Sequence, residues 1–104
     1  MIKINGEVWR VFLVSPSHPL LVTPEGTLAL GVCDDIARGI YISNALPRKQ
    51  IRKVLCHELV HAAMYSYNVD ISDETEEIVA DLIATYGDEI IRLTNLVYNK
   101  YKNK

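Results

Sequence analysis

Two histidines four residues apart, with a glutamate directly after the first, are the residues of this chain best suited to chemistry. They form the sequence His57-Glu58-Leu59-Val60-His61. Residues four apart on a helix lie on the same face, so the two imidazoles can bind one tetrahedral zinc ion, with Glu58 beside its open position. The competing interpretation is a coincidence of ordinary helix residues, but their polar groups would then lack partners beside an apolar face.

A catalytic zinc ion normally has three protein ligands and one water, so a third ligand is required. The remaining histidine, His18, lies far upstream in a proline-flanked loop, whereas the chain after the motif is acidic. Glu77 and Asp81 are four residues apart, so Glu77 can bind zinc while Asp81 accepts a hydrogen bond from the distal nitrogen of His57. Glu76 is the main rival of Glu77 as third ligand. The alternative for the acidic run as a whole is a favourable interaction with a helix N-terminus.

These two segments together resemble the gluzincin pattern, in which H-E-x-x-H is followed by E-x-x-x-D. The second part here is Glu77-Ile78-Val79-Ala80-Asp81. The spacing and total length are similar to those of minigluzincins and of small phage-encoded zincin-like peptidases. The resemblance implies a zincin-like fold, zinc as the cofactor, hydrolysis of peptide bonds, Glu58 as general base and Glu77 as third ligand.

Such a site would hydrolyse a peptide bond with an activated water. Zinc lowers the pKa of a bound water to about 7, so Glu58 can accept its proton and later protonate the leaving amine. A second group that stabilises the negative charge on the substrate oxygen is also expected. The sequence leaves five candidates open for it: His18, Tyr65, Tyr67, Tyr86 and Arg92.

One helix must carry both histidines, and two more are expected after it. Apolar residues recur at helical spacing and predict a helix from about Pro47 to Tyr67. The second helix is expected to begin at Ser72 or Asp73, because Asp73 and Glu76 have capping-box spacing. Gly87 is expected to end it, and a third helix is expected from Asp88 to about Tyr101.

The first 43 residues predict short strands joined by turns. Asn5-Gly6 is typical of a tight hairpin. The expected strands cover residues 2–4, 7–14, 20–22, 27–33 and 39–43, which gives a small, mostly antiparallel sheet of three to five strands. With three helices, this is one α+β domain over residues 1–104. The strand Gly39 to Ser43 is either an exposed edge that pairs with an extended peptide or an ordinary sheet strand whose Ile40 and Ile42 face the core.

Charge and cysteine content limit the partners. Lys and Arg number 11 against 13 Asp and Glu, so no general attraction to nucleic acid is expected. The sequence lacks an apolar run long enough to span a membrane and a C-x-x-C pair, which favours a reduced, cytoplasmic protein. Cys56 should point about 100° away from His57 around the helix, so we expect a small apolar residue there rather than a ligand. The expected partner is a peptide or protein substrate, bound by a monomer.

The small size supports an alternative function on the same scaffold. A domain of this length has little surface for deep specificity pockets. The chain would then be a zinc-binding regulatory or interaction protein, either catalytically silent or kept latent by its C-terminal segment, Tyr98 to Lys104, lying over the cleft.

Overall fold

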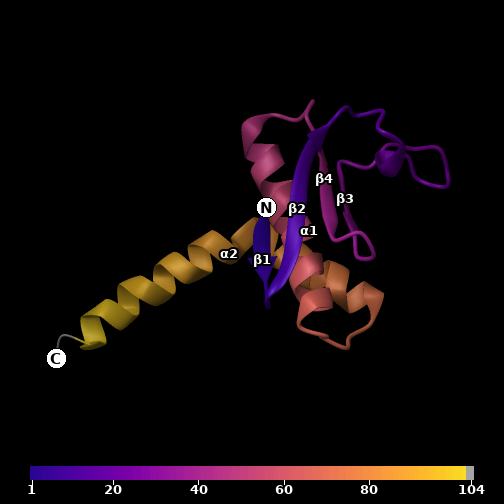
Figure 1. Ribbon diagram of the computed structural model, residues 1–104. Coiled ribbons are helices and arrows are strands. Elements are labelled where there is room, and N and C mark those ends of the chain that lie inside the picture. Colours follow the sequence, from indigo (N-terminus) through magenta and orange to yellow (C-terminus); the bar gives the residue numbers. More distant parts are fainter. Residues whose placement is uncertain (103–104) are drawn as a thin grey trace.

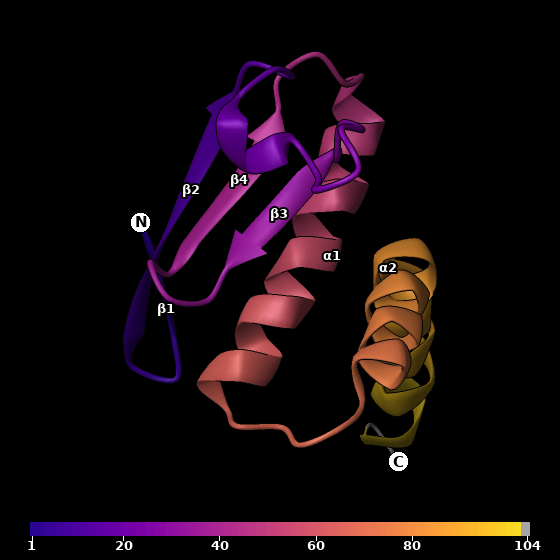
Figure 2. The ribbon, with the colours of Figure 1, turned by 90° about the vertical axis from the view of Figure 1, so that its right-hand side faces the viewer.

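The chain is arranged in three layers, and helix α1 (Arg48–Ser66) is the middle one. The computed structural model describes residues 1–102. A sheet covers one side of α1, and helix α2 (Asp73–Lys102) packs on the other side, as Figure 2 shows. The expected α+β class is confirmed, and so is the first helix, within one residue at each end.

The sheet has four strands and is mixed rather than purely antiparallel. The strands are β1 (Ile2–Ile4), β2 (Glu7–Val14), β3 (Gly31–Asp34) and β4 (Gly39–Ser43), in the spatial order β1-β2-β4-β3. β1 pairs with β2, and β3 with β4, in antiparallel orientation, whereas β2 and β4 run parallel. β4 therefore lies inside the sheet, so the interpretation of residues 39–43 as an exposed edge is wrong. The edge strand on that side is β3.

The hairpin between β1 and β2 forms where the sequence predicts it. Asn5 and Gly6 both have positive φ, 49° and 78°, as the two central residues of a type I′ hairpin turn require. Asn5 also donates a hydrogen bond from Nδ2 to the carbonyl oxygen of Ser66, at 2.9 Å. The turn thereby holds the last residue of α1 against the sheet.

The segment between β2 and β3 differs from the expectation. Residues Pro19–Leu21 form a short 3-10 helix rather than a strand, and Val22 makes only an isolated bridge to Leu28. Proline fixes φ near the helical value at the start of the turn, and the Nδ1 atom of His18 accepts a hydrogen bond from the Leu20 amide, so a helical turn is favoured. The next strand consequently begins at Gly31 instead of residue 27.

The core lies between the sheet and α1. Trp9, Ile40, Ile42 and Ala62 are fully buried there. Ile40 and Ile42 alternate along β4, which places both on the face that packs against α1. The indole Nε1 of Trp9 donates to the hydroxyl of Ser66 at 2.8 Å, so the one polar atom of this large side chain has a partner.

α2 is a single helix of 30 residues, so the expectation of three helices is wrong. Gly87 lies inside α2 and lacks the positive φ of a helix-ending glycine. A glycine within a helix costs about 1 kcal/mol relative to alanine, which the helical pattern on both sides and the contacts with α1 overcome. One such contact joins Arg52 Nη1 and Asp88 Oδ2, 2.7 Å apart, directly after the glycine.

The second half of α2 extends beyond the other layers (Figure 1). The molecule is elongated as a result, measuring 56 × 31 × 28 Å. Despite its length, α2 is not apolar enough to cross a membrane, and neither is any other helix in residues 1–102.

Candidate metal centre

The antiparallel packing of α1 and α2 decides which side chains meet. Residues 67–72 connect the two helices, so residues near the end of α1 lie opposite residues near the start of α2. His61 meets Glu76, and one helical turn farther from the connection His57 meets Asp81. The two histidines thus lie along one face of α1, opposite the acidic first turns of α2.

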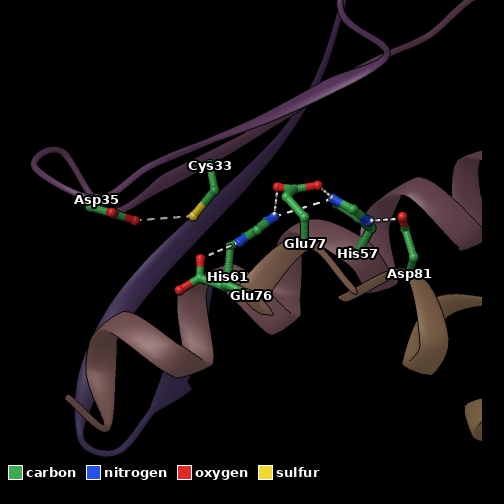
Figure 3. Close-up of polar contacts among 7 residues, drawn as sticks. All are labelled: Cys33, Asp35, His57, His61, Glu76, Glu77 and Asp81. Carbon is green, nitrogen blue, oxygen red and sulfur yellow. Dashed lines mark hydrogen bonds and ion pairs between the residues drawn. The ribbon is translucent and has the colours of Figure 1, made fainter. Parts of the chain in front are cut away.

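Three side chains bring a possible metal-binding atom to one point. The Nε2 atoms of His57 and His61 are 3.2 Å apart. Glu77 places one carboxylate oxygen 3.2 Å from Nε2 of His57 and the other 2.8 Å from Nε2 of His61. Figure 3 shows this carboxylate between the two rings. The three residues form a group that could hold a metal ion.

The other nitrogen of each ring has a carboxylate of its own. Asp81 Oδ1 lies 3.0 Å from Nδ1 of His57, and Glu76 contacts Nδ1 of His61. A neutral imidazole that donates from Nδ1 has its lone pair on Nε2. Both lone pairs then point toward each other and toward Glu77. Three electron-pair donors without a proton between them are a favourable environment for a cation.

The spacing fits a small tetrahedral ion. Ligand bonds of about 2.0–2.1 Å at tetrahedral angles put the ligand atoms roughly 3.3 Å apart. The 3.2 Å between the two Nε2 atoms agrees with this value. Two imidazoles and one carboxylate are also a common donor set of catalytic zinc sites. The residues present therefore fit a zinc ion.

The electrostatic surroundings of His61 also favour positive charge. Burial alone lowers the pKa of its imidazole, but the hydrogen bond with Glu76 and the charges of Glu77, Glu58 and Glu76 outweigh that effect and raise the pKa above its ordinary value. The same carboxylates would stabilise a bound metal cation.

Glu58 is held beside the two histidines in a largely buried position. It is 8% exposed and lines the clefts on both sides of His57. Burial raises the pKa of its carboxyl group, an effect that the neighbouring histidines reduce. Gly31 of β3 makes room for it, because a Cβ atom there would lie 3.3 Å from the Glu58 side chain and 2.6 Å from that of Val54. An acid with a raised pKa in a cleft is suited to proton transfer.

Glu76 has a role that differs from its expected one. The hydroxyl of Ser72 accepts a hydrogen bond from the Thr75 amide at 3.2 Å, so Ser72 is the cap and Glu76 lies outside the capping box. Its carboxylate binds His61 instead, which the sequence interpretation missed. The sequence does contain an indication of this contact. If Asp81 contacts Nδ1 of His57, an acid about one helical turn nearer the connection between the helices should contact Nδ1 of His61.

Of the five candidates for the second oxyanion-stabilising group, Tyr65 is the one that lines a cleft together with His61. His18 stacks on Tyr41 instead, with ring centres 5.6 Å apart. Arg92 lines a different cleft, between the outer parts of α1 and α2.

The cysteines lie outside the ligand set. Cys56 lines the cleft that also contains Arg52 and Ile83, so it points away from the metal-binding atoms, as expected. Cys33 lies on β3, opposite His61 in Figure 3, and its thiol contacts Asp35 at 3.4 Å. Burial, followed by the charge of Asp35, raises the pKa of this thiol and keeps it protonated.

A groove passes over the candidate metal centre, with α1 as its floor and β3 and α2 as its walls. Three adjoining clefts make it up, with volumes of about 340, 440 and 370 Å³. Neighbouring clefts share lining residues: Gly31, His57 and Glu58 in one pair, and Asp35, His61 and Glu76 in the other. The groove is thus open at both sides of the histidines, as an extended ligand requires.

Removing either carboxylate behind the histidines should weaken metal binding. Asp81→Asn and Glu76→Gln each replace the charged acceptor that fixes the ring and its tautomer with a neutral amide, which is a weaker acceptor and can also turn its NH2 group toward the ring. We therefore expect a loss of zinc affinity of about 10–100-fold in a chelator competition titration. Glu74→Gln is the matched control, since it removes a charge from the same helix turn without touching a histidine. Unchanged affinity in both test variants would show that these contacts do not orient the rings.

Comparisons of the chain with protein-family models, with curated proteins and with solved structures found no match. Functional inference therefore depends on the chemistry of the groove itself.

Proposed function

We propose that this protein is a zinc-dependent metallopeptidase of the gluzincin type on a zincin-like fold. His57, His61 and Glu77 would hold the zinc ion, and Glu58 would be the general base. The observation that carries the proposal is the convergence of two imidazole lone pairs and one carboxylate in an open groove, with a second, buried carboxylate next to them. The two unpaired cysteines agree with the proposed cytoplasmic location.

A bound zinc ion would polarise the substrate carbonyl and make a water molecule more acidic. The Glu58 carboxylate would take the proton of the attacking water, and the protonated carboxyl group would then pass that proton to the amine nitrogen as the carbon–nitrogen bond breaks. Burial raises the pKa of the Glu58 carboxyl group, which would make its carboxylate a stronger base in the first step and let the acid keep the proton until the amine takes it.

The substrate would lie along β3. This strand pairs with β4 on one side only, and its residues Gly31, Val32 and Cys33 line the groove on the other. An extended peptide can therefore add to the sheet as a further strand, which brings one of its carbonyl groups to the metal centre. Tyr65, in the adjoining cleft, is our candidate for the second group that stabilises the oxyanion.

The test is metal analysis followed by a substrate screen. Protein purified without added zinc should contain about one zinc ion per chain and should cleave members of a mixed peptide library, with cleavage stopped by a chelator and restored by zinc. A chain without bound metal would contradict the whole proposal. Bound zinc without cleavage of any peptide would favour the alternative of a silent zinc-binding protein.

The described residues do not favour latency by the C-terminal segment. Residues 98–102 continue α2 away from the groove (Figure 1), and the clefts that form the groove contain no residue beyond Ala84. The last two residues of that segment, 103 and 104, lie outside the part of the chain that the structure describes.

A further inference from the structure

α2 has a second apolar face that is largely exposed within the described residues 1–102. Its residues are spaced alternately by four and three positions, which is the spacing of a coiled-coil seam. This set, here named the α2 stripe, consists of Val79, Ile83, Tyr86, Ile90, Leu93 and Val97. The spacing is maintained over nearly three heptads and passes through Gly87 without interruption.

The α2 stripe lies to one side of the face that α2 packs against α1. Ala80, which is fully buried, marks the inner face of α2, and the carboxylates of Glu77, Asp81 and Asp88 reach α1 from one side of it. At about 100° per residue, the stripe is directed nearly opposite to these three. The stripe is exposed from Ile83 to Val97, whereas Val79 at its start is half-buried and Ile83 also borders the cleft that contains Cys56 of α1.

Exposure of the stripe is large for apolar side chains. Ile83, Tyr86, Ile90, Leu93 and Val97 are between 40% and 55% exposed, and the flanking Leu82 and Leu96 are 50% and 51% exposed. With about 200 Å² for a whole large apolar residue, these side chains expose roughly 700 Å². A stable interface buries about 800 Å² per partner, so the α2 stripe together with its flanking Leu82 and Leu96 is close to sufficient for one.

The residue types point to a second copy of the same helix. In a coiled coil the first core position of each heptad is occupied here by Ile83, Ile90 and Val97, and the other by Val79, Tyr86 and Leu93. β-branched residues at the first position favour two parallel strands, and Leu93 adds the leucine preferred at the other position. In an antiparallel pair centred on the same heptads, Glu89 of one copy would face Glu89 of the other, and the two negative charges would repel each other. In a parallel pair Glu89 faces Thr94, without like-charge repulsion.

We infer that the protein forms a parallel homodimer through the α2 stripe, in place of the monomer expected from the sequence. The stripe of each copy contacts that of the other around a two-fold axis along the helices. α1, the sheet and both metal centres then lie on the outer sides of the pair, so each groove stays open. The inference is independent of the proposed peptidase activity, because no stripe residue contributes to the metal centre.

Sedimentation equilibrium of the full chain tests the inference. The parent protein should show twice the 11.8 kDa chain mass at micromolar to millimolar concentration. Ile90→Lys and Val97→Lys each bury an unpaired charge from both copies, so each should weaken the dimer by at least about 100-fold. Tyr98→Lys is the matched control: it adds the same charge to an exposed apolar position next to the stripe and should change dimerisation by less than about threefold.

Circular dichroism must show unchanged helix content in all three variants, so that loss of the dimer is not loss of the fold. A parent chain that stays monomeric at millimolar concentration would overturn the inference, and so would a dimer that both lysine variants retain. Binding of a monomeric parent to lipid vesicles through the stripe would also overturn it.

A cysteine cross-link tests the orientation of the helices. Leu93→Cys places a thiol opposite its own copy in a parallel dimer, so mild oxidation should yield a covalent dimer. The parent chain, with Cys33 and Cys56 alone, controls for the native thiols. If Leu93→Cys alone does not cross-link but a mixture with Ile83→Cys does, the parallel arrangement is wrong.

Discussion

Glu58→Gln is expected to keep its zinc ion and to lose peptide hydrolysis by a factor of about 10³ or more. Glutamine has nearly the same shape, so the packing against Gly31 and Val54 should be preserved. The amide cannot accept a proton from water near neutral pH, and it has no acid form to protonate the leaving amine. The measurement is kcat/KM on a cleaved peptide, made together with the zinc content of the same sample.

Glu74→Gln serves as the control for loss of one negative charge near the centre and should keep both zinc and activity. Hydrolysis retained by Glu58→Gln would remove Glu58 from the proposed mechanism while leaving the metal centre in place. Loss of zinc from this variant would instead show that the buried carboxylate stabilises the cation directly.

The part of the site that sequence predicts well is the part set by local geometry. His57 and His61 share a face because both lie on one helix, and the helical pattern of α1 is unambiguous. The same four-residue spacing relates Glu77 to Asp81, and the structure places the first at the Nε2 atoms and the second at Nδ1 of His57. Neither placement requires knowledge of contacts between distant segments beyond the antiparallel packing of two consecutive helices.

Errors arise where one residue or one distant contact decides the outcome. Of the two expected caps, Ser72 rather than Asp73 caps α2, so the expected capping box of Asp73 and Glu76 does not form and Glu76 contacts His61 instead. Gly87 predicts a helix end locally, but the packing of α2 on α1 and the continuing helical pattern carry the helix through it. Tertiary contacts outweigh a local cost of about 1 kcal/mol.

The topology of the sheet could not be obtained from local patterns. The parallel pairing of β2 with β4 depends on how residues 15–30 carry the chain past the sheet before β3 forms. Strand patterns do not encode which neighbour a strand selects. The consequence is functional, because this pairing makes β3 rather than β4 the strand that borders the groove.

His57→Ala is expected to lose both the zinc ion and hydrolysis, in contrast to Glu58→Gln. The substitution removes one of three ligand atoms and leaves the carboxylates of Glu77 and Asp81 without the imidazole between them. Zinc binding that is restricted to the folded state stabilises it, by about 2.7 kcal/mol when free zinc is a hundred times the dissociation constant. Zinc should therefore raise the unfolding temperature of the parent chain but not that of His57→Ala.

The two variants together separate the metal from the base. Hydrolysis should be absent in both, whereas the zinc-dependent rise in unfolding temperature should be present in Glu58→Gln and absent in His57→Ala. Arg52→Ala is a control for general damage to the packing of α1 on α2, because it breaks the exposed contact with Asp88 and should change neither stability appreciably nor zinc binding. A His57→Ala protein that still gains stability from zinc would place the cation elsewhere in the chain, and the assignment of the groove as the catalytic centre would then be wrong.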